Sequence, residues 1–273
     1  MLKVVRDLRE VPTYAMLALK YTGKNERDWR RRWRRWQAAG WVTVTSRGMG
    51  SYQRVRLTTR GLRLLEPLTP PCELPASPVL YISASGTPVP SEPEPKKKRL
   101  IAPRATSTRY LDHTLSIVDL FVALLLGSVP PDVLTPSWTV QRHAWITAPA
   151  IPDLLAVWRK LGLILLFEID CGSEHLTKFL IPKLGRLQDY VRDQTPGAAV
   201  TILVLTPRLA RQRKLRQDIQ KNLPSDISIL VESLPDRPGP QTLALFQKRY
   251  AQEVASWSQT RPFAVSRPVE SSG

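Results

Sequence analysis

The chain has 273 residues, enough for two domains of ordinary size, and 42% of them are hydrophobic, as in globular proteins. Its 40 Lys and Arg against 23 Asp and Glu leave a formal net charge of +17, which favours a polyanionic partner, chiefly nucleic acid. The longest apolar stretch, residues 117–126, is much shorter than the ~20 residues of a membrane span. Because no apolar signal segment follows Lys3 and Arg6, and because Cys72 and Cys171 are too few for a disulfide framework, we expect a cytoplasmic protein with no membrane partner.

The first 66 residues carry most of the excess charge, with 16 Lys and Arg against five Asp and Glu, a net charge of +11. Residues 11–21 favour a helix, and a second helix begins near Asn25, a residue type that often caps helices. Two β-rich runs, residues 41–45 and 52–57, flank a glycine-containing turn and predict a hairpin. Helix, helix and hairpin are the layout of a winged helix-turn-helix, whose second helix enters the major groove of DNA.

The second helix has a tryptophan face. Trp29, Trp33 and Trp36 are spaced i, i+4 and i+7, so they share one side of the helix, and we expect them in the core rather than as stacking platforms for RNA. The arginines between them turn outward, and those of the hairpin extend the basic surface. The residues expected to contact double-stranded DNA are Arg27, Arg30, Arg31, Arg32, Arg34, Arg35, Arg47, Arg54 and Arg56. A merely solvated arginine face is the alternative, and it fits less well because the charges share one sign.

Residues 67–108 are dense in proline and contain the basic run Lys96–Arg99. Proline removes backbone donors and favours extended chain, so we interpret this segment as a linker, in which residues 79–84 have the composition of a short edge strand. The linker separates a domain at residues 1–66 from a second domain at residues 109–257. Residues 258–273 are expected to be a loose tail.

Helical and strand patterns alternate in the second domain, which predicts an α/β fold. We expect helices at residues 110–126, 173–192, 208–221 and 241–257, and strands at 151–158, 163–170, 200–205 and 227–231.

Acidic residues interrupt the apolar strands of this domain. If the chain turns around Lys160 and Leu161, Asp153 lies opposite Glu168, with β-carbons about 5 Å apart. Strand alternation then puts Asp170 on the same face as Glu168. Three converging carboxylates are hard oxygen ligands of the kind that bind Mg²⁺ or Mn²⁺. We therefore expect Asp153, Glu168 and Asp170 to form a metal site.

The helix after these strands brings a lysine towards the acids. Its apolar stripe consists of Leu176, Phe179, Leu180, Leu184, Leu187 and Val191. Lys183 falls near the middle of this stripe, although the proline before it can kink the helix and change the phase. In a nuclease, Asp153, Glu168 and Asp170 would hold a metal that activates water, and Lys183 would neutralise the scissile phosphate or position the water. The alternative is an internal salt-bridge network that fixes the hairpin to the helix.

Five short motifs stand out along the chain: Leu57–Gly61, His113 with Ile117–Asp119, Pro152–Asp153, Phe167–Glu174 and Lys183–Leu184. Together they resemble the replication-relaxation family of plasmids and other bacterial mobile elements. The resemblance covers most of residues 1–220 outside the linker. It implies a role in plasmid replication, DNA relaxation or mobilisation, and a second domain of the restriction-endonuclease-like fold, whose hallmark is Pro-Asp followed by acid-x-Lys. Asp170 stands at the lysine position of that hallmark, so activity requires a lysine from the next helix, as Lys183 would supply.

Two functions of different classes follow. In the first, the chain is a DNA-binding protein of a plasmid or other mobile element whose nuclease-like domain cuts DNA with Mg²⁺ or Mn²⁺. In the second, it is a non-enzymatic regulator or accessory factor. Its second domain is then an inactive nuclease fold that contacts other replication or mobilisation proteins or forms a homodimer.

Overall fold

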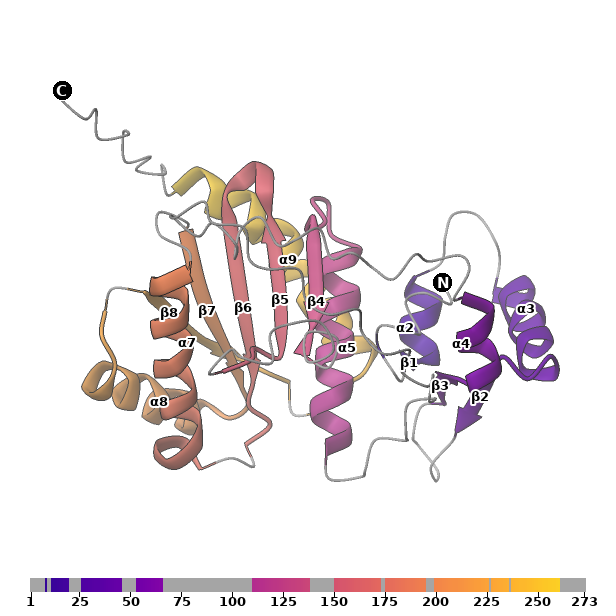
Figure 1. Cartoon of the computed structure of the whole chain (residues 1–273), viewed down its shortest axis with the longest axis horizontal. Coiled ribbons are helices and arrows are strands. Elements are labelled where there is room, and N and C mark those ends of the chain that lie inside the picture. The colour runs from indigo at the N-terminus through magenta and orange to yellow at the C-terminus, as the bar shows by residue number, and fades with distance from the viewer. Residues whose placement is uncertain are drawn as a thin grey trace, which may run out of the picture. The chain divides into compact units, whose positions relative to one another are not determined.

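The structure, a computed structural model, describes residues 8, 11–19, 26–45, 53–65, 110–137, 150–172, 175–194, 199–225, 227–235 and 237–260 (Figure 1). The expected linker at 67–108, with its strand at 79–84, lies outside these residues, as do Arg47 and residues 261–273. The chain divides into two compact units, residues 1–118 and 119–273, and the boundary falls inside helix α5, Leu111–Leu125.

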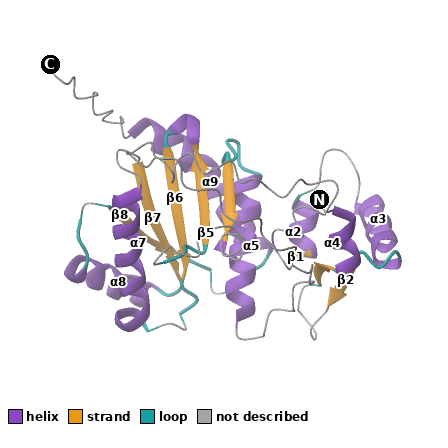
Figure 2. Cartoon of the chain, viewed as in Figure 1, coloured by secondary structure: helices purple, strands orange, loops and turns teal. Residues whose placement is uncertain are grey.

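The first unit combines helices with an antiparallel sheet (Figure 2). Its described elements are β1 (Val11–Pro12), α2 (Thr13–Ala18), α3 (Glu26–Ala38), β2 (Val42–Thr45), β3 (Arg54–Leu57) and α4 (Thr59–Leu65). The strand order β1-β3-β2 places β3 in the centre of the sheet. The helix expected at residues 11–21 begins only at Thr13, because Val11 pairs with Val55 of β3. The expected hairpin is present as β2 and β3.

Helix α4 is an element that the hairpin pattern did not predict. Thr58 caps it, because its Oγ accepts the N–H of Gly61 at 3.0 Å and donates to the carbonyl of Gly40 at 2.5 Å. A β-carbon at Gly61 would lie 2.1 Å from the backbone oxygen of Trp41. Only glycine therefore allows α4 to pack this closely on the turn before β2.

The second unit is built around a five-stranded mixed sheet of order β4-β5-β6-β7-β8. Its strands are β4 (Val133–Pro136), β5 (Leu154–Trp158), β6 (Leu163–Ile169), β7 (Ala199–Thr206) and β8 (Ser228–Ser233). Its helices after α5 are α7 (Ile181–Gln194), α8 (Leu209–Asn222) and α9 (Pro240–Thr260), so the last helix runs into the expected tail. The mixed α/β fold expected from the alternation is present, whereas the edge strand β4 was not predicted. No described helix combines the length and apolar character of a membrane span.

Strands β4, β5 and β6 run antiparallel, and β6, β7 and β8 run parallel. Every residue of β6 is buried, as is usual for a strand covered on both faces. Its Phe167 meets Tyr250 of α9 edge-to-face, with ring centroids 5.7 Å apart. Its neighbour Glu168 points to the other face and contacts Lys183 of α7. Helices α7 and α9 thus cover opposite faces of β6 (Figure 1).

The register of the β5–β6 hairpin confirms the pairing expected from the sequence. Leu154 pairs with Phe167, and Trp158 pairs with Leu163. The chain turns through a short 3₁₀ segment, Arg159–Leu161, and Gly162 takes a left-handed conformation with φ of 57°. The ladder, continued by one residue, brings Asp153 beside Glu168.

Candidate functional site

The centre of the second unit holds a lysine between two carboxylates. The Nζ of Lys183 lies 2.5 Å from Oε2 of Glu168 and 3.9 Å from Oδ1 of Asp153. The Glu168 side chain is 3% exposed, whereas Lys183 retains 27% exposure. The acids belong to neighbouring strand segments and the lysine to the helix above them. The ammonium group of Lys183 thus lies near both carboxylates, and its side chain remains partly accessible to solvent.

Backbone contacts fix the orientation of Asp153. Its Oδ2 accepts the N–H of Ile169 at 2.8 Å, and its carbonyl accepts the N–H of Ser137 at 2.9 Å. The residue therefore links the end of β6 to the segment after β4. Since Oδ2 is bound to the backbone, Oδ1 is the oxygen that approaches Lys183.

A π-helical turn, Leu176–Leu180 (η4), precedes α7 and sets the phase of Lys183. The N–H of Ile181 bonds to the carbonyl of Leu176, five residues back. Pro182 lacks a donor N–H and its ring clashes with the carbonyl four residues earlier in a regular helix, which favours a wide turn here. The predicted apolar stripe is wrong at one position, because the wide turn leaves Phe179 55% exposed.

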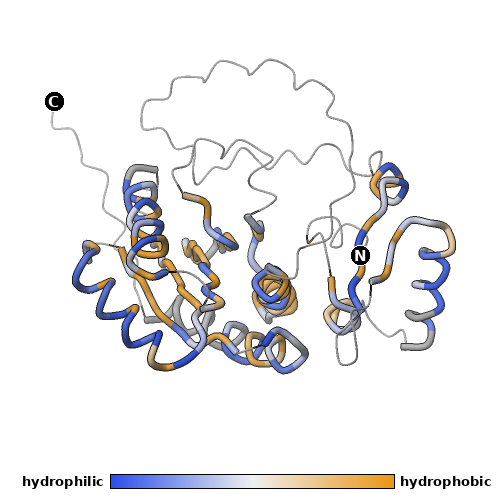
Figure 3. The backbone as a smooth tube through the Cα atoms, turned by 90° about the horizontal axis from the view of Figure 1, so that it is seen from below, coloured by the Kyte–Doolittle hydropathy of each residue, from blue (hydrophilic) through white to orange (hydrophobic). Residues whose placement is uncertain are grey.

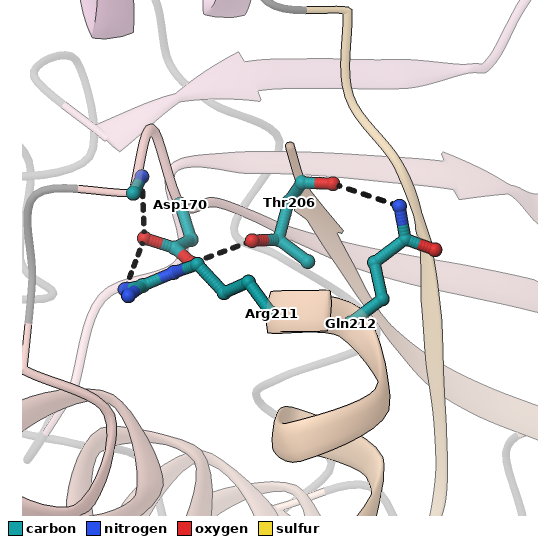
Figure 4. Close-up of polar contacts among 5 residues, drawn as sticks. Asp170, Thr206, Arg211 and Gln212 are labelled. Carbon is teal, nitrogen blue, oxygen red and sulfur yellow. Dashed lines mark hydrogen bonds and ion pairs between the residues drawn. The ribbon is translucent and has the colours of Figure 1, made fainter. Parts of the chain in front are cut away.

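Asp170 does not join the other two acids, and this corrects the expected cluster of three. The guanidinium group of Arg211 of α8 makes a bidentate contact with its carboxylate, in which Nε donates to Oδ2 at 2.5 Å and Nη2 donates to Oδ1 at 2.9 Å (Figure 4). The hydroxyl of Thr206 donates to Oδ2 at 2.7 Å, and the N–H of Gly172 donates to Oδ1 at 2.9 Å. Strand β6 ends at Ile169, so strand alternation no longer directs this side chain. Among the described residues, no group of three or more His, Cys, Asp or Glu is placed to hold a metal ion.

The basic surface of the first unit is carried by α3. Arg31, Arg32, Arg34 and Arg35 are exposed. The side chains of Arg27 and Arg30, like that of Trp29 and the whole of Arg47, lie outside the described part of the chain.

The tryptophans of α3 lie on a different side from most of its arginines. Trp33 and Trp36 are half-buried, with ring centroids 6.2 Å apart. In the hairpin, Arg56 is half-buried and Arg54 is 4% exposed. The expectation that Arg54 contacts DNA is therefore wrong, because this residue of the central strand β3 has its side chain buried inside the unit.

The family model for replication-relaxation matches residues 5–203 of the chain. The protein belongs to the replication-relaxation family. Membership indicates a role in plasmid replication or relaxation. No curated protein and no solved structure matches the chain. The replication-relaxation match contains Asp153, Glu168 and Lys183, whereas Thr206 and the whole of α8 lie beyond it.

The donor set of this replication-relaxation protein fits a divalent metal with two carboxylates rather than three. Asp153 and Glu168 flank one positive atom, the Nζ of Lys183, so the place between them stabilises a cation. Two carboxylates completed by waters are a common ligand set for Mg²⁺.

Sequence reasoning missed Arg211 as the partner of Asp170. The signal available was an arginine in the first turn of a helix that follows a strand, as in Thr206–Arg211.

Proposed function

We propose that this protein binds duplex DNA of a plasmid or other mobile element through α3, and that its second unit is a metal-dependent nuclease-like domain. The observation that carries the proposal is the convergence of Asp153, Glu168 and Lys183 from three separate elements. Pro-Asp, an acid on the next strand and a lysine are the chemical set that the restriction-endonuclease-like resemblance implies, with the lysine supplied by α7.

DNA binding by the first unit is supported by shape and charge. The order of α2, α3 and a hairpin, with β1 completing the sheet, suits a winged helix. Helix α3 exposes arginines on the side away from its half-buried tryptophans, and its acids, Glu26 and Asp28, are confined to the first turn. Exposed arginines without intervening acids bind phosphates and steer DNA to the protein. If α3 is the recognition helix, replacing Arg31, Arg32, Arg34 and Arg35 by Gln weakens binding to a fluorescent duplex.

In the nuclease-like unit, Asp153 and Glu168 would hold Mg²⁺ or Mn²⁺, which supplies an activated water and stabilises charge on the reacting phosphate. Lys183, the partly exposed member of the set, would then exchange its contact with Glu168 for one with the scissile phosphate. The hydrogen bond from Ile169 holds the carboxylate of Asp153 in place. Asp170 takes no part in metal binding, because its two oxygens are engaged by Arg211, Thr206 and Gly172.

The second candidate function is that of a non-enzymatic DNA-binding factor, with the second unit as a scaffold. It is favoured by the close Lys183–Glu168 ion pair, which neutralises the buried acid without a metal. In that case the pair fixes α7 to the sheet and the unit contacts other replication or mobilisation proteins.

A nicking assay separates the two functions. Supercoiled plasmid is incubated with the full chain and Mg²⁺ or Mn²⁺, and Glu168→Gln is compared with Glu232→Gln. Glu232 is a matched control, because it is an ion-paired carboxylate of the same sheet, 3.2 Å from Arg249 and 21% exposed. A nuclease predicts a loss of about 10²-fold or more for Glu168→Gln, a size typical of removing one charge-stabilising group, and little change for the control. No cutting by the wild-type protein with either metal refutes the nuclease and leaves the scaffold.

A further inference from the structure

Helix α8 carries a basic charge that the candidate site does not use. Residues 119–273 contain 18 Lys and Arg against 14 Asp and Glu, a net charge of +4. Residues 208–221 alone contain six Lys and Arg and one acid, a net charge of +5. The positive charge of the second unit is therefore concentrated in one helix and the residue before it.

The charges of α8 gather on its outward face. Gln212 and Leu215 are buried and Ile219 is half-buried, which defines the inward side of the helix. The exposed cations Arg213, Lys214 and Lys221 fall within about 100° of one another on the opposite side. The acid of this helix, Asp218, is half-buried and lies at the edge of this face, about 40° from Lys214. Figure 3 colours the backbone by residue hydropathy, and there α8 is mostly in the blue of hydrophilic residues, unlike the strands of the adjoining sheet.

Polar contacts along the inward side hold α8 in a fixed orientation. Near its start, the guanidinium group of Arg211 forms a bidentate contact with the carboxylate of Asp170 (Figure 4). The side chain of Gln212 donates to the carbonyl of Thr206 at 3.3 Å. One turn later, Nη2 of Arg216 donates to the carbonyl of Val231 in β8 at 2.7 Å. The helix is therefore anchored to the ends of β6 and β7 and to β8. The backbone that carries these cations is therefore already ordered before a ligand binds, so binding needs no further ordering of the helix.

The start of α8 lies at the end of the sheet that carries the candidate site. Glu168 pairs in register with Val204 of β7, and β7 ends two residues later at Thr206. Helix α8 begins at Leu209, directly after this end. A polyanion lying along the outward face of α8 would therefore reach the same end of the sheet as Glu168.

From this arrangement we infer that the outward face of α8, formed by Arg213, Lys214 and Lys221, is a second contact for duplex DNA that binds its phosphates. The inference rests on the proposed function for the identity of the polyanion. Between the cations the face holds Ala210 and Gln217, and a single exposed leucine, Leu209, lies beside Arg213, so the face lacks the continuous apolar layer with which amphipathic helices enter a lipid surface. The three exposed cations outnumber the one half-buried acid beside them, Asp218, so the face keeps a net positive charge that fits the regular phosphate charges of a duplex and reads no base sequence.

The test is the salt dependence of DNA binding by the full chain. Binding of a fluorescent duplex is titrated between about 50 and 200 mM KCl, and the slope of log K against log salt counts the phosphates contacted, at roughly 0.9 per contact. The variant Arg213→Gln/Lys214→Gln/Lys221→Gln is expected to flatten the slope by about 2 to 3 units. The control is Arg159→Gln/Arg237→Gln/Lys248→Gln, which removes the same charge from three other exposed positions of the unit. It should change the slope by less than about 1 unit.

Hydrogen exchange gives a readout that needs no substitution. In the wild-type complex with DNA, amides of residues 209–222 should exchange more slowly than in the free protein, whereas unchanged exchange there counts against the inference. Equal slopes for the α8 variant and its control overturn the inference, as does binding of α8 to anionic phosphatidylglycerol vesicles with the DNA slope unchanged.

The same salt titration distinguishes a failure of DNA binding by α8 from a failure of DNA binding by α3. A slope that falls in the α8 variant but not in the quadruple arginine variant of α3 supports the inference and refutes DNA binding by α3. The reverse result supports α3 and overturns the role of α8.

Discussion

Lys183→Met is the most informative single substitution, because it removes the cation from between the two carboxylates and keeps the length of the side chain. It leaves Glu168, 3% exposed, without its partner at 2.5 Å. Breaking a fully buried ion pair in this way costs about 3 to 5 kcal/mol, and breaking an exposed pair costs about 0 to 1 kcal/mol. Because Lys183 itself is 27% exposed, solvent compensates part of the loss. We expect a destabilisation of about 2 to 3 kcal/mol.

The assay is urea unfolding at neutral pH, with the double variant Lys183→Met/Glu168→Gln completing a cycle. Removing the buried charge together with its partner should recover a large part of the loss. The control is Arg192→Met, which breaks an exposed pair with Asp189 at 3.0 Å, and less than about 1 kcal/mol is expected. If Lys183→Met behaves like the control, or if the double variant is no more stable than Lys183→Met, the description of a buried charge held by this lysine is wrong.

The same variant separates the two functions of the second unit without an activity measurement. When the competing ammonium is absent, the two carboxylates repel each other and gain more from a divalent cation. Mg²⁺ or Mn²⁺ should therefore raise the Tm of Lys183→Met more than that of the wild type, through preferential binding to the folded state. No rise in Tm for either protein argues against a metal site between Asp153 and Glu168.

Two further predictions concern stability. Gly61→Ala places a β-carbon 2.1 Å from the backbone oxygen of Trp41 and should destabilise the first unit by about 2 kcal/mol or more, seen as a fall of roughly 10 °C in its Tm. Gly185→Ala, whose β-carbon meets a flexible side chain at 3.3 Å, is the comparison and should change the Tm much less; equal effects would contradict the steric argument. Burial, followed by the charge of Glu232, holds the pKa of Tyr250 well above its usual value of 10. The unfolded chain therefore loses this proton above about pH 10 while the folded chain keeps it, so stability falls as pH rises; Tyr250→Phe should reduce that fall in unfolding experiments between about pH 9 and 11.

The features that could be predicted from the sequence are those set by short stretches of the chain. The β5–β6 register follows from a turn and strand alternation over a few residues, and it is found as expected. The placement of Lys183 beside the acids follows from counting along one helix, and the wide turn at η4 lies before that lysine rather than after it. The same turn explains the error at Phe179, since a regular helix was assumed.

The features that could not be predicted from the sequence depend on residues that are distant in the chain. Asp170 is turned away from the other acids by Arg211, 41 positions later. Arg54 is buried in β3, which becomes the central strand of its sheet only because β1, more than 40 positions earlier, pairs with it. Neither partner leaves a periodic signal near the residue that it affects.

The position of β6 between an antiparallel and a parallel neighbour has a consequence for the order of folding. Strand β5 reaches β6 through a turn of a few residues, whereas β7 pairs with β6 only after a crossover that contains α7. Local contacts close with a smaller loss of chain entropy, so we expect the hairpin to form before the β6–β7 pairing. In that order Asp153 and Glu168 would meet before Lys183 reaches them, and their charges would oppose close packing of the hairpin until α7 docks. Lys183 thus links the crossover to the hairpin, and its ion pair with Glu168 balances a charge that the hairpin alone leaves buried.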